Sequence, residues 1–128
     1  MALKPKILLI EDNEQNRYLA TFLLEKRGYQ VLSVPDGPMG IELAGKELPS
    51  LILLDIQLPS MDGYTVARRL RENPALKATP IVAVTSYAMA GDREKTIAAG
   101  CNGYIEKPIN PDTFVEEIRK FLGKVNNI

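Results

Sequence analysis

Histidine is absent from this 128-residue sequence, and cysteine occurs once, as Cys101. Without histidine the chain cannot carry a phosphohistidine, and it lacks the imidazole and paired thiolate ligands that zinc sites need. A single cysteine excludes an internal disulfide and is typical of proteins kept in the reducing cytoplasm. The sequence therefore argues against a zinc site and favours a cytoplasmic location.

Net charge and long apolar runs are also missing. The 16 basic and 16 acidic residues balance, so the chain lacks the excess positive charge typical of proteins that bind DNA or RNA. The runs ILLI and LILL are far shorter than the roughly 20 residues of a membrane span. The N-terminal MALKPK has no apolar core of a secretion signal. We therefore expect neither a nucleic acid nor a membrane as a partner.

The composition that remains fits one folded domain. A length of 128 residues is close to the usual domain size of roughly 100–150 residues, and 45% hydrophobic residues can form a core. Strand-like and helix-like segments alternate from end to end, which predicts a parallel sheet with helices on both faces. We expect one doubly wound α/β domain over residues 1–128, with a core at about residues 5–124.

The alternation predicts five strand–helix units. The expected strands are Lys6–Ile10, Gln30–Val34, Leu51–Leu54, Ile81–Val84 and Gly103–Ile105. The expected helices are Glu14–Lys26, about ten residues after the turn at 35–38, Tyr64–Glu72, part of 85–100, and a last helix opened by Asn110-Pro111. The fourth helix is alanine-rich with Ile97 as its large aliphatic residue, so it should be the least firmly packed. The arginines at 68, 69 and 71 are expected on a solvated face.

Charged residues follow three of the predicted strands. Glu11 and Asp12 follow the first strand, Asp55 the third, and Lys107 the fifth. Because ligands bind at the carboxyl ends of parallel strands, we expect these side chains to meet at one edge of the sheet. Three carboxylates would repel one another unless a cation shares the site, and their oxygens suit Mg²⁺. A metal ion beside a lysine is suited to a phosphoryl group.

Four segments carry a family resemblance: ILLIEDN, LILLDIQLPSMDG, VAVTSYA and GYIEKPI. Together, in this order and spacing, they resemble the receiver domain of two-component response regulators over nearly the whole chain. Because no further domain is appended in this sequence, the stand-alone, CheY-like type is expected. The resemblance implies a flavodoxin-like sheet of five parallel strands in the order 2-1-3-4-5, with five helices.

The resemblance also implies roles for individual residues. Asp55 matches the phosphoacceptor, whose carboxylate attacks a phosphohistidine of a histidine kinase or a histidine phosphotransfer protein. Mg²⁺ or Mn²⁺ is expected on Asp12, Asp55 and the backbone carbonyl of Gln57. Glu11 is expected to bind the metal partly through water. Lys107 matches the lysine that pairs with the phosphoryl oxygens.

Thr85 and Tyr104 match the switch pair of the family. The hydroxyl of Thr85 would donate to the phosphoryl group, and Tyr104 would rotate inward and repack the face of the fourth helix, fifth strand and fifth helix. The Lys107-Pro108 peptide bond is expected to be cis. These roles imply output to a downstream protein effector. They imply a signalling domain and no enzyme activity beyond its own phosphorylation and slow dephosphorylation.

The sequence is also compatible with other functions and with purely structural roles for these residues. A Mg²⁺-dependent phosphatase of the haloacid-dehalogenase type would need a second acid two residues after its nucleophile, where Gln57 stands. A pseudo-receiver that only binds proteins would not need the intact charged quartet. Structurally, Asp12 could cap a helix, Lys107 could be a surface lysine, and Tyr104 could be a fixed aromatic residue. Thr85 could likewise be a strand-end hydroxyl without a switching role.

Overall fold

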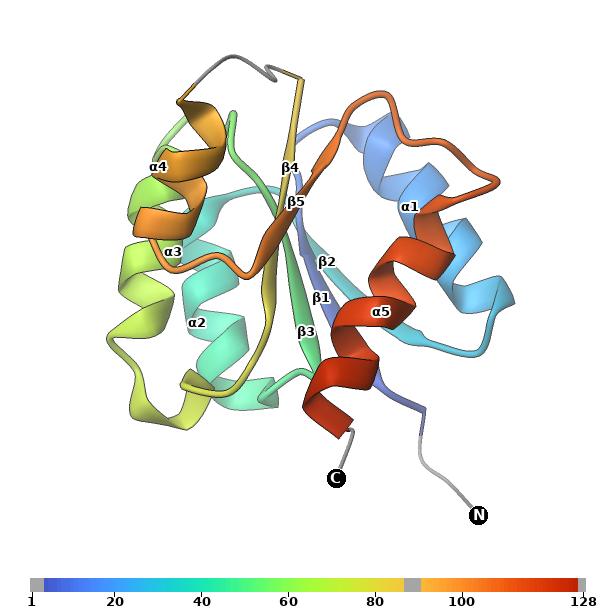
Figure 1. Cartoon of the computed structure of the whole chain (residues 1–128), viewed down its shortest axis with the longest axis horizontal. Helices are drawn as coiled ribbons and strands as arrows, with labels where there is room; N and C mark the ends of the chain where they lie inside the picture. The colour runs from blue at the N-terminus through green and yellow to red at the C-terminus, as the bar shows by residue number, and fades with distance from the viewer. Residues whose placement is uncertain (1–3, 87–90, 127–128) are drawn as a thin grey trace.

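The computed structural model describes residues 4–86 and 91–126, which form one five-stranded sheet flanked by helices (Figure 1). The strands are β1 (Lys6–Ile10), β2 (Gln30–Val34), β3 (Leu51–Asp55), β4 (Ile81–Thr85) and β5 (Gly103–Glu106). All neighbouring strands are parallel, in the order β2-β1-β3-β4-β5. The predicted doubly wound fold and its strand order are confirmed.

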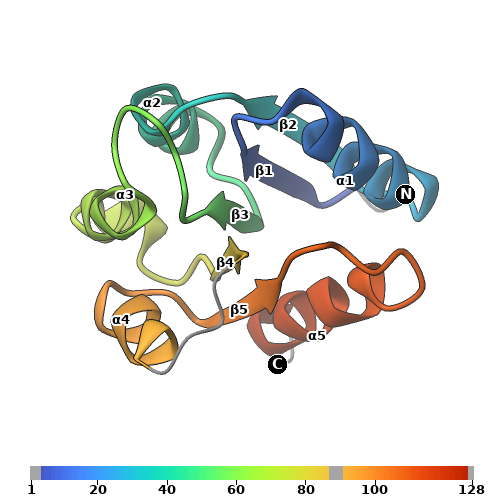
Figure 2. The ribbon, with the colours of Figure 1, turned by 90° about the horizontal axis from the view of Figure 1, so that it is seen from above.

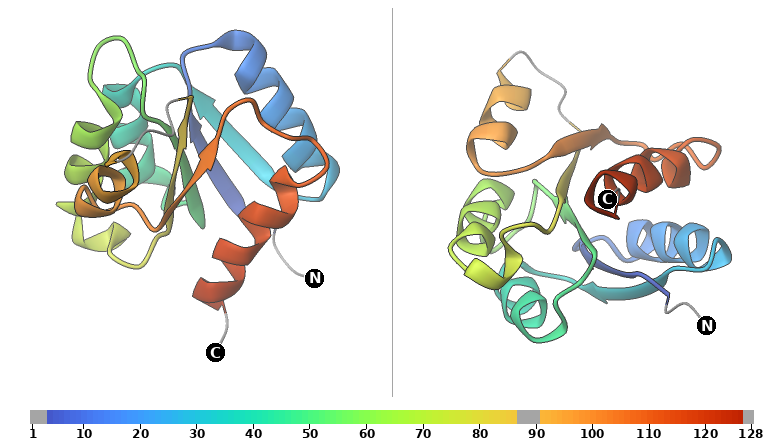
Figure 3. Two further views of the ribbon diagram at one scale, coloured as in Figure 1. Left: turned by 45° about the horizontal axis from the view of Figure 1, so that its top comes forward. Right: turned by 60° about the horizontal axis from the view of Figure 1, so that its bottom comes forward.

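Helices cover both faces of the sheet. They are α1 (Glu14–Lys26), α2 (Gly37–Glu47), α3 (Gly63–Arg71), α4 (Asp92–Ala98) and α5 (Phe114–Asn126), with a short 3₁₀ helix η1 (Pro74–Leu76). Helices α1 and α5 lie on one face, and α2, α3 and α4 lie on the other (Figure 2). The oblique views in Figure 3 show the same three layers. In the part of the chain described, no helix is both long enough and apolar enough to cross a bilayer.

The central strands are buried on both faces, which explains their continuous apolar sequences. In β3, Ile52 and Leu54 pack into the cluster formed with α2 and α3, whereas Leu51 and Leu53 pack into the cluster formed with α1 and α5. All four side chains are fully buried. This alternation follows from the two-residue period of a strand. It fixes the register of the sheet and therefore the level at which each strand ends.

Side-chain caps fix where three of the helices begin. The side-chain oxygens of Asn13, Asp36 and Asp62 accept hydrogen bonds from the backbone N–H three residues later, at 2.8, 2.9 and 3.0 Å. Such caps satisfy N–H groups that have no partner within the helix. Because Asn13 caps α1, the carboxylate of Asp12 is left for another role.

Helices α4 and α5 differ in part from the expectation. The fourth helix was predicted within residues 85–100, of which 87–90 lie outside the described residues. Helix α4 begins at Asp92. Ile97 is 59% exposed, so the large aliphatic residue of α4 faces outward. Regular α5 begins at Phe114, three residues after Pro111, because the carbonyl of Asn110 accepts hydrogen bonds within a preceding turn.

Arg71 corrects the expectation that the arginines of α3 are all solvated. Its Nε donates to the carbonyl of Gly100 at 2.9 Å, and its Nη1 donates to the carbonyl of Leu76 at 2.8 Å. Its Nη2 donates at 2.7 Å to Asn102 Oδ1, which also accepts from the backbone N–H of Ile81 at 2.9 Å. Burial lowers the pKa of the guanidinium. Arg71 therefore joins α3, η1, the start of β4 and the turn before β5.

Replacing Arg71 should destabilise the fold far more than replacing its exposed neighbour Arg69. Arg71→Ala removes the hydrogen bonds of a charged donor to Gly100, Leu76 and Asn102, and it should lower the free energy of unfolding by about 3 kcal/mol. Arg69→Ala should change it by less than about 0.5 kcal/mol. Urea unfolding followed by circular dichroism measures both. Equal effects of the two variants would show that the Arg71 network contributes nothing specific.

Candidate active site

The register of the sheet brings the charged residues together at its carboxyl edge. Ile10 pairs with Leu54 across β1 and β3, so Glu11 and Asp55 stand at the same level. Lys107 follows β5 and its backbone N–H donates at 2.8 Å to the carbonyl of the last residue of β4. The prediction that three strand ends share one site therefore has a direct geometric basis in this sheet.

Lys107 joins two buried carboxylates. Its Nζ lies 3.0 Å from Glu11 Oε1 and 3.2 Å from Asp55 Oδ2. The Asp55 side chain is 2% exposed, and that of Lys107 is 14% exposed. Burial alone lowers the pKa of Lys107, but its pairing with Glu11 and Asp55 outweighs burial and raises the pKa above its usual value. The ammonium group is therefore firmly charged and held between the two acids.

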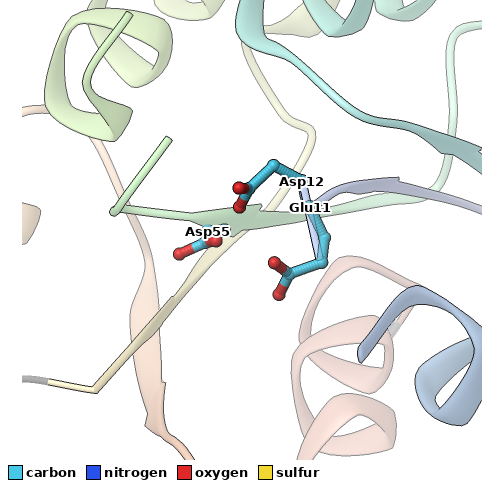
Figure 4. A group of neighbouring side chains, drawn as sticks. All are labelled: Glu11, Asp12 and Asp55. Carbon is cyan, nitrogen blue, oxygen red and sulfur yellow. The ribbon is translucent and has the colours of Figure 1, made fainter. Parts of the chain in front are cut away.

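Asp12 completes a group of three acids. One carboxylate oxygen from each of Glu11, Asp12 and Asp55 lies within 4.8 Å of the others. Figure 4 shows Glu11 and Asp12 approaching Asp55 from the end of β1. With all groups ionised, three negative charges face one positive charge. Burial raises the pKa of Glu11 to about 7, and the contact with Asp55 contributes in the same direction. A hard divalent cation fits this donor set.

The loop after β3 closes tightly over Asp55. The backbone N–H of Gln57 donates to Asp55 Oδ1 at 2.9 Å, which orients the carboxylate. Gly63 then returns the chain, and its N–H donates to the carbonyl of Ile56 at 2.9 Å. A Cβ at Gly63 would lie 2.4 Å from the Cα of Ile56, so only glycine allows this approach. The sequence shows Gly63 only as an ordinary glycine after a helix cap, so its role at the site was not predicted.

The side chain of Gln57 connects two loops at this edge. Its Oε1 accepts from the backbone N–H of Ser86 at 3.3 Å, just after β4. Its Nε2 is buried and makes no hydrogen bond with any residue that the structure describes. The metal-binding role expected of Gln57 concerns its backbone carbonyl. The contact with Ser86 was not predicted because it joins residues 29 positions apart.

The remaining predicted residues lie on β4, on β5 and just after β5. Thr85 ends β4 and is 3% exposed, beside the carboxylate edge. Tyr104 is half-buried on β5, where it packs against the cluster formed with α2 and α3. The guanidinium of Arg93 lies 5.4 Å from the centre of the Tyr104 ring. The Lys107-Pro108 peptide bond is cis.

Comparison with known proteins identifies the family. Residues 7–119 match the response regulator receiver domain. The polar-differentiation response regulator DivK of Brucella anthropi is 40% identical over 117 residues, which cover 91% of this chain and 95% of DivK. This agrees with the four sequence segments that indicated a receiver domain.

Solved structures give the same result. The receiver domain of the sensor histidine kinase PA1611 from Pseudomonas aeruginosa PAO1 has a TM-score of 0.87 and 34% identity, covering 94% of this chain and 98% of that domain. That structure has a magnesium ion coordinated in the active site cleft. A CheY-like receiver domain protein from Methanospirillum hungatei JF-1 has a TM-score of 0.90 and 28% identity, covering 98% of both chains.

The strand order, the acidic cluster at the carboxyl edge and the relatives all agree. Proteins of this kind bind Mg²⁺ at an acidic site and act as phosphoacceptor modules between histidine kinases and downstream effectors. The chain therefore belongs to the response regulator receiver family and functions in two-component signalling.

Proposed function

We propose that Asp55 accepts a phosphoryl group from a phosphohistidine on a histidine kinase or a histidine phosphotransfer protein. The observation that carries the proposal is the convergence of Lys107 on Asp55 and Glu11, at 3.2 and 3.0 Å, beside the carboxylate of Asp12. Both oxygens of Asp55 are engaged, Oδ2 by the ammonium of Lys107 and Oδ1 by the loop N–H of Gln57. It is therefore oriented for attack on an incoming phosphorus atom.

The transfer forms an acyl phosphate. A carboxylate oxygen of Asp55 forms a bond to phosphorus while the P–N bond to the imidazole breaks. The electron pair of that bond returns to the ring nitrogen, which then takes a proton from solvent. The ammonium of Lys107 offsets negative charge on the phosphoryl oxygens as they approach. Water later hydrolyses the acyl phosphate and restores the carboxylate.

Mg²⁺, or Mn²⁺ in its place, is the proposed cofactor. Asp12, Asp55 and the backbone carbonyl of Gln57 would hold the ion directly. Glu11, whose carboxylate pairs with Lys107 and accepts from the backbone N–H of Asn13, would act partly through water. When bound, the ion supplies positive charge that offsets the carboxylates and the phosphoryl oxygens.

Thr85 and Tyr104 are the proposed switch. Thr85 would donate its hydroxyl hydrogen to the phosphoryl group, and Tyr104 would then change position on the α4-β5-α5 face. Tyr104 and Arg93 border two surface hollows of about 390 and 360 Å³. These hollows give the Tyr104 side chain space in which to move. The output would be a changed surface read by a protein effector, in the cytoplasm that the single cysteine favours.

The phosphoacceptor role is tested by matched replacements of two acids. With acetyl phosphate and Mg²⁺, the wild-type protein should gain one phosphoryl group in its intact mass, and Asp55→Asn should gain none because its nucleophile is lost. Asp62→Asn is the control: Asp62 is an exposed helix cap, and asparagine also caps well, so this variant should be modified as the wild type is.

Two results would contradict the phosphoacceptor role. Modification of Asp55→Asn at the wild-type rate would place the phosphoryl group on another residue. Repeated hydrolysis of an organic phosphate such as p-nitrophenyl phosphate, with many turnovers for each protein molecule, would favour the phosphatase function instead.

The metal site is tested by removing Asp12. Its carboxylate is exposed and makes no hydrogen bond or ion pair with any described residue, so Asp12→Asn should leave the metal-free fold intact. Mg²⁺ binding measured by calorimetry should weaken by at least about tenfold. Glu25→Gln, which removes an exposed acid at the far end of α1, should bind as the wild type does. Unchanged affinity in Asp12→Asn would remove Asp12 from the ligand set.

A further inference from the structure

Arg17, on the second turn of α1, bonds to three consecutive backbone carbonyls. Its Nη1 donates to the carbonyl of Glu11 at 2.8 Å and to the carbonyl of Asp12 at 3.1 Å. Its backbone N–H donates to the carbonyl of Asn13 at 3.0 Å. One residue therefore holds the whole turn that leads from β1 into α1. No pattern in the sequence distinguishes this arginine from the other arginines on helix surfaces.

The two acids in this turn are held in different ways. Glu11 has its own contacts: its N–H donates to Val34 at 3.0 Å, and its carboxylate accepts from Asn13 and pairs with Lys107. The carboxylate of Asp12 has no such partner among the described residues. Its direction is therefore set by its backbone, and the carbonyl of that backbone accepts from the Arg17 guanidinium.

We propose that Arg17 is a positioning residue for the metal site, acting on Asp12 through the backbone. The inference rests on the proposed binding of Mg²⁺ by this cluster. Mg²⁺ demands near-ideal octahedral geometry, so a ligand whose main chain is fixed in advance loses less freedom when the ion binds. Groups that orient metal ligands without touching the metal commonly change the affinity by 10–100-fold. Arg17 has the contacts of such a group.

The positive charge of Arg17 allows the direction of a change in Mg²⁺ affinity to be interpreted. A guanidinium close to the site repels a divalent cation, so loss of that charge alone would tighten Mg²⁺ binding. Loss of the bonds to the Glu11 and Asp12 carbonyls would instead weaken it. The two effects oppose each other, and weaker binding can therefore be assigned to positioning.

The experiment compares Mg²⁺ affinity in Arg17→Met, Arg17→Lys and Arg27→Met by titration calorimetry. Arg17→Met should bind about tenfold more weakly than the wild type. Arg17→Lys keeps the positive charge and much of the side-chain length. Its Mg²⁺ affinity should therefore lie between that of the wild type and that of Arg17→Met. Arg27→Met removes an exposed arginine at the far end of the same helix and should bind as the wild type does.

A second measurement needs no metal. In EDTA, amide hydrogen exchange at residues 11–13 should be faster in both Arg17 variants, while exchange in the strands of the core stays at the wild-type rate. Faster exchange throughout the protein would instead show a general loss of stability and would overturn the local role. If Arg17→Met unfolds, Arg17→Lys provides the same comparison.

The outcomes separate this inference from the proposed function. Wild-type affinity, or tighter binding, in Arg17→Met overturns the positioning role and leaves the metal site in place. Equal weakening in Arg27→Met overturns it as well, because the effect would then not depend on the contacts of Arg17 with the Glu11 and Asp12 carbonyls. A wild-type protein that does not bind Mg²⁺ at all overturns the proposed cofactor and the role of Arg17 with it.

Discussion

The pairing of one ammonium group with two buried carboxylates is the interaction on which the site depends. Lys107 holds Glu11 and Asp55 together at the edge of the sheet. Removing one partner from a buried ion pair commonly costs about 3–5 kcal/mol, because the remaining charge is left without compensation. The pairing exists only because β1, β3 and β5 end at a shared edge. The fold is therefore a condition for the chemistry. Only strand orders that bring the ends of β1, β3 and β5 together allow these ion pairs to form.

The cluster divides its acids into two kinds. Glu11 and Asp55 are buried and already paired, whereas Asp12 is exposed and oriented by its backbone. Such a division suits an ion that keeps several of its waters, since Mg²⁺ then needs few direct protein ligands. The residue that stabilises the turn, Arg17, makes its side-chain contacts with backbone carbonyls and not with the carboxylates.

Much of the fold and the charged quartet could be predicted because each depends on local sequence. Continuous apolar runs mark buried parallel strands, and charged residues directly after them fall at one edge whatever the details of packing. The strand order itself came from the family resemblance. The contacts of Arg71, Gln57 and Gly63 could not be predicted, because their partners lie elsewhere in the chain or depend on close approach of the backbone. The exposure of Ile97 likewise depends on how α4 rotates onto the sheet.

Helix α4 is held by contacts at both of its ends. At its C-terminal end, the carbonyl of Gly100 accepts from Arg71, and the positive φ of 108° at Gly100 fixes a tight exit from the helix. At its N-terminal end, Gly91 has no side chain with which to cap the helix, and the guanidinium of Arg93 lies 5.4 Å from the centre of the Tyr104 ring. The contact between Arg93 and Tyr104 therefore links the first turn of α4 to β5. A change in the position of Tyr104, as proposed for the switch, would therefore also change the exposed surface around Arg93.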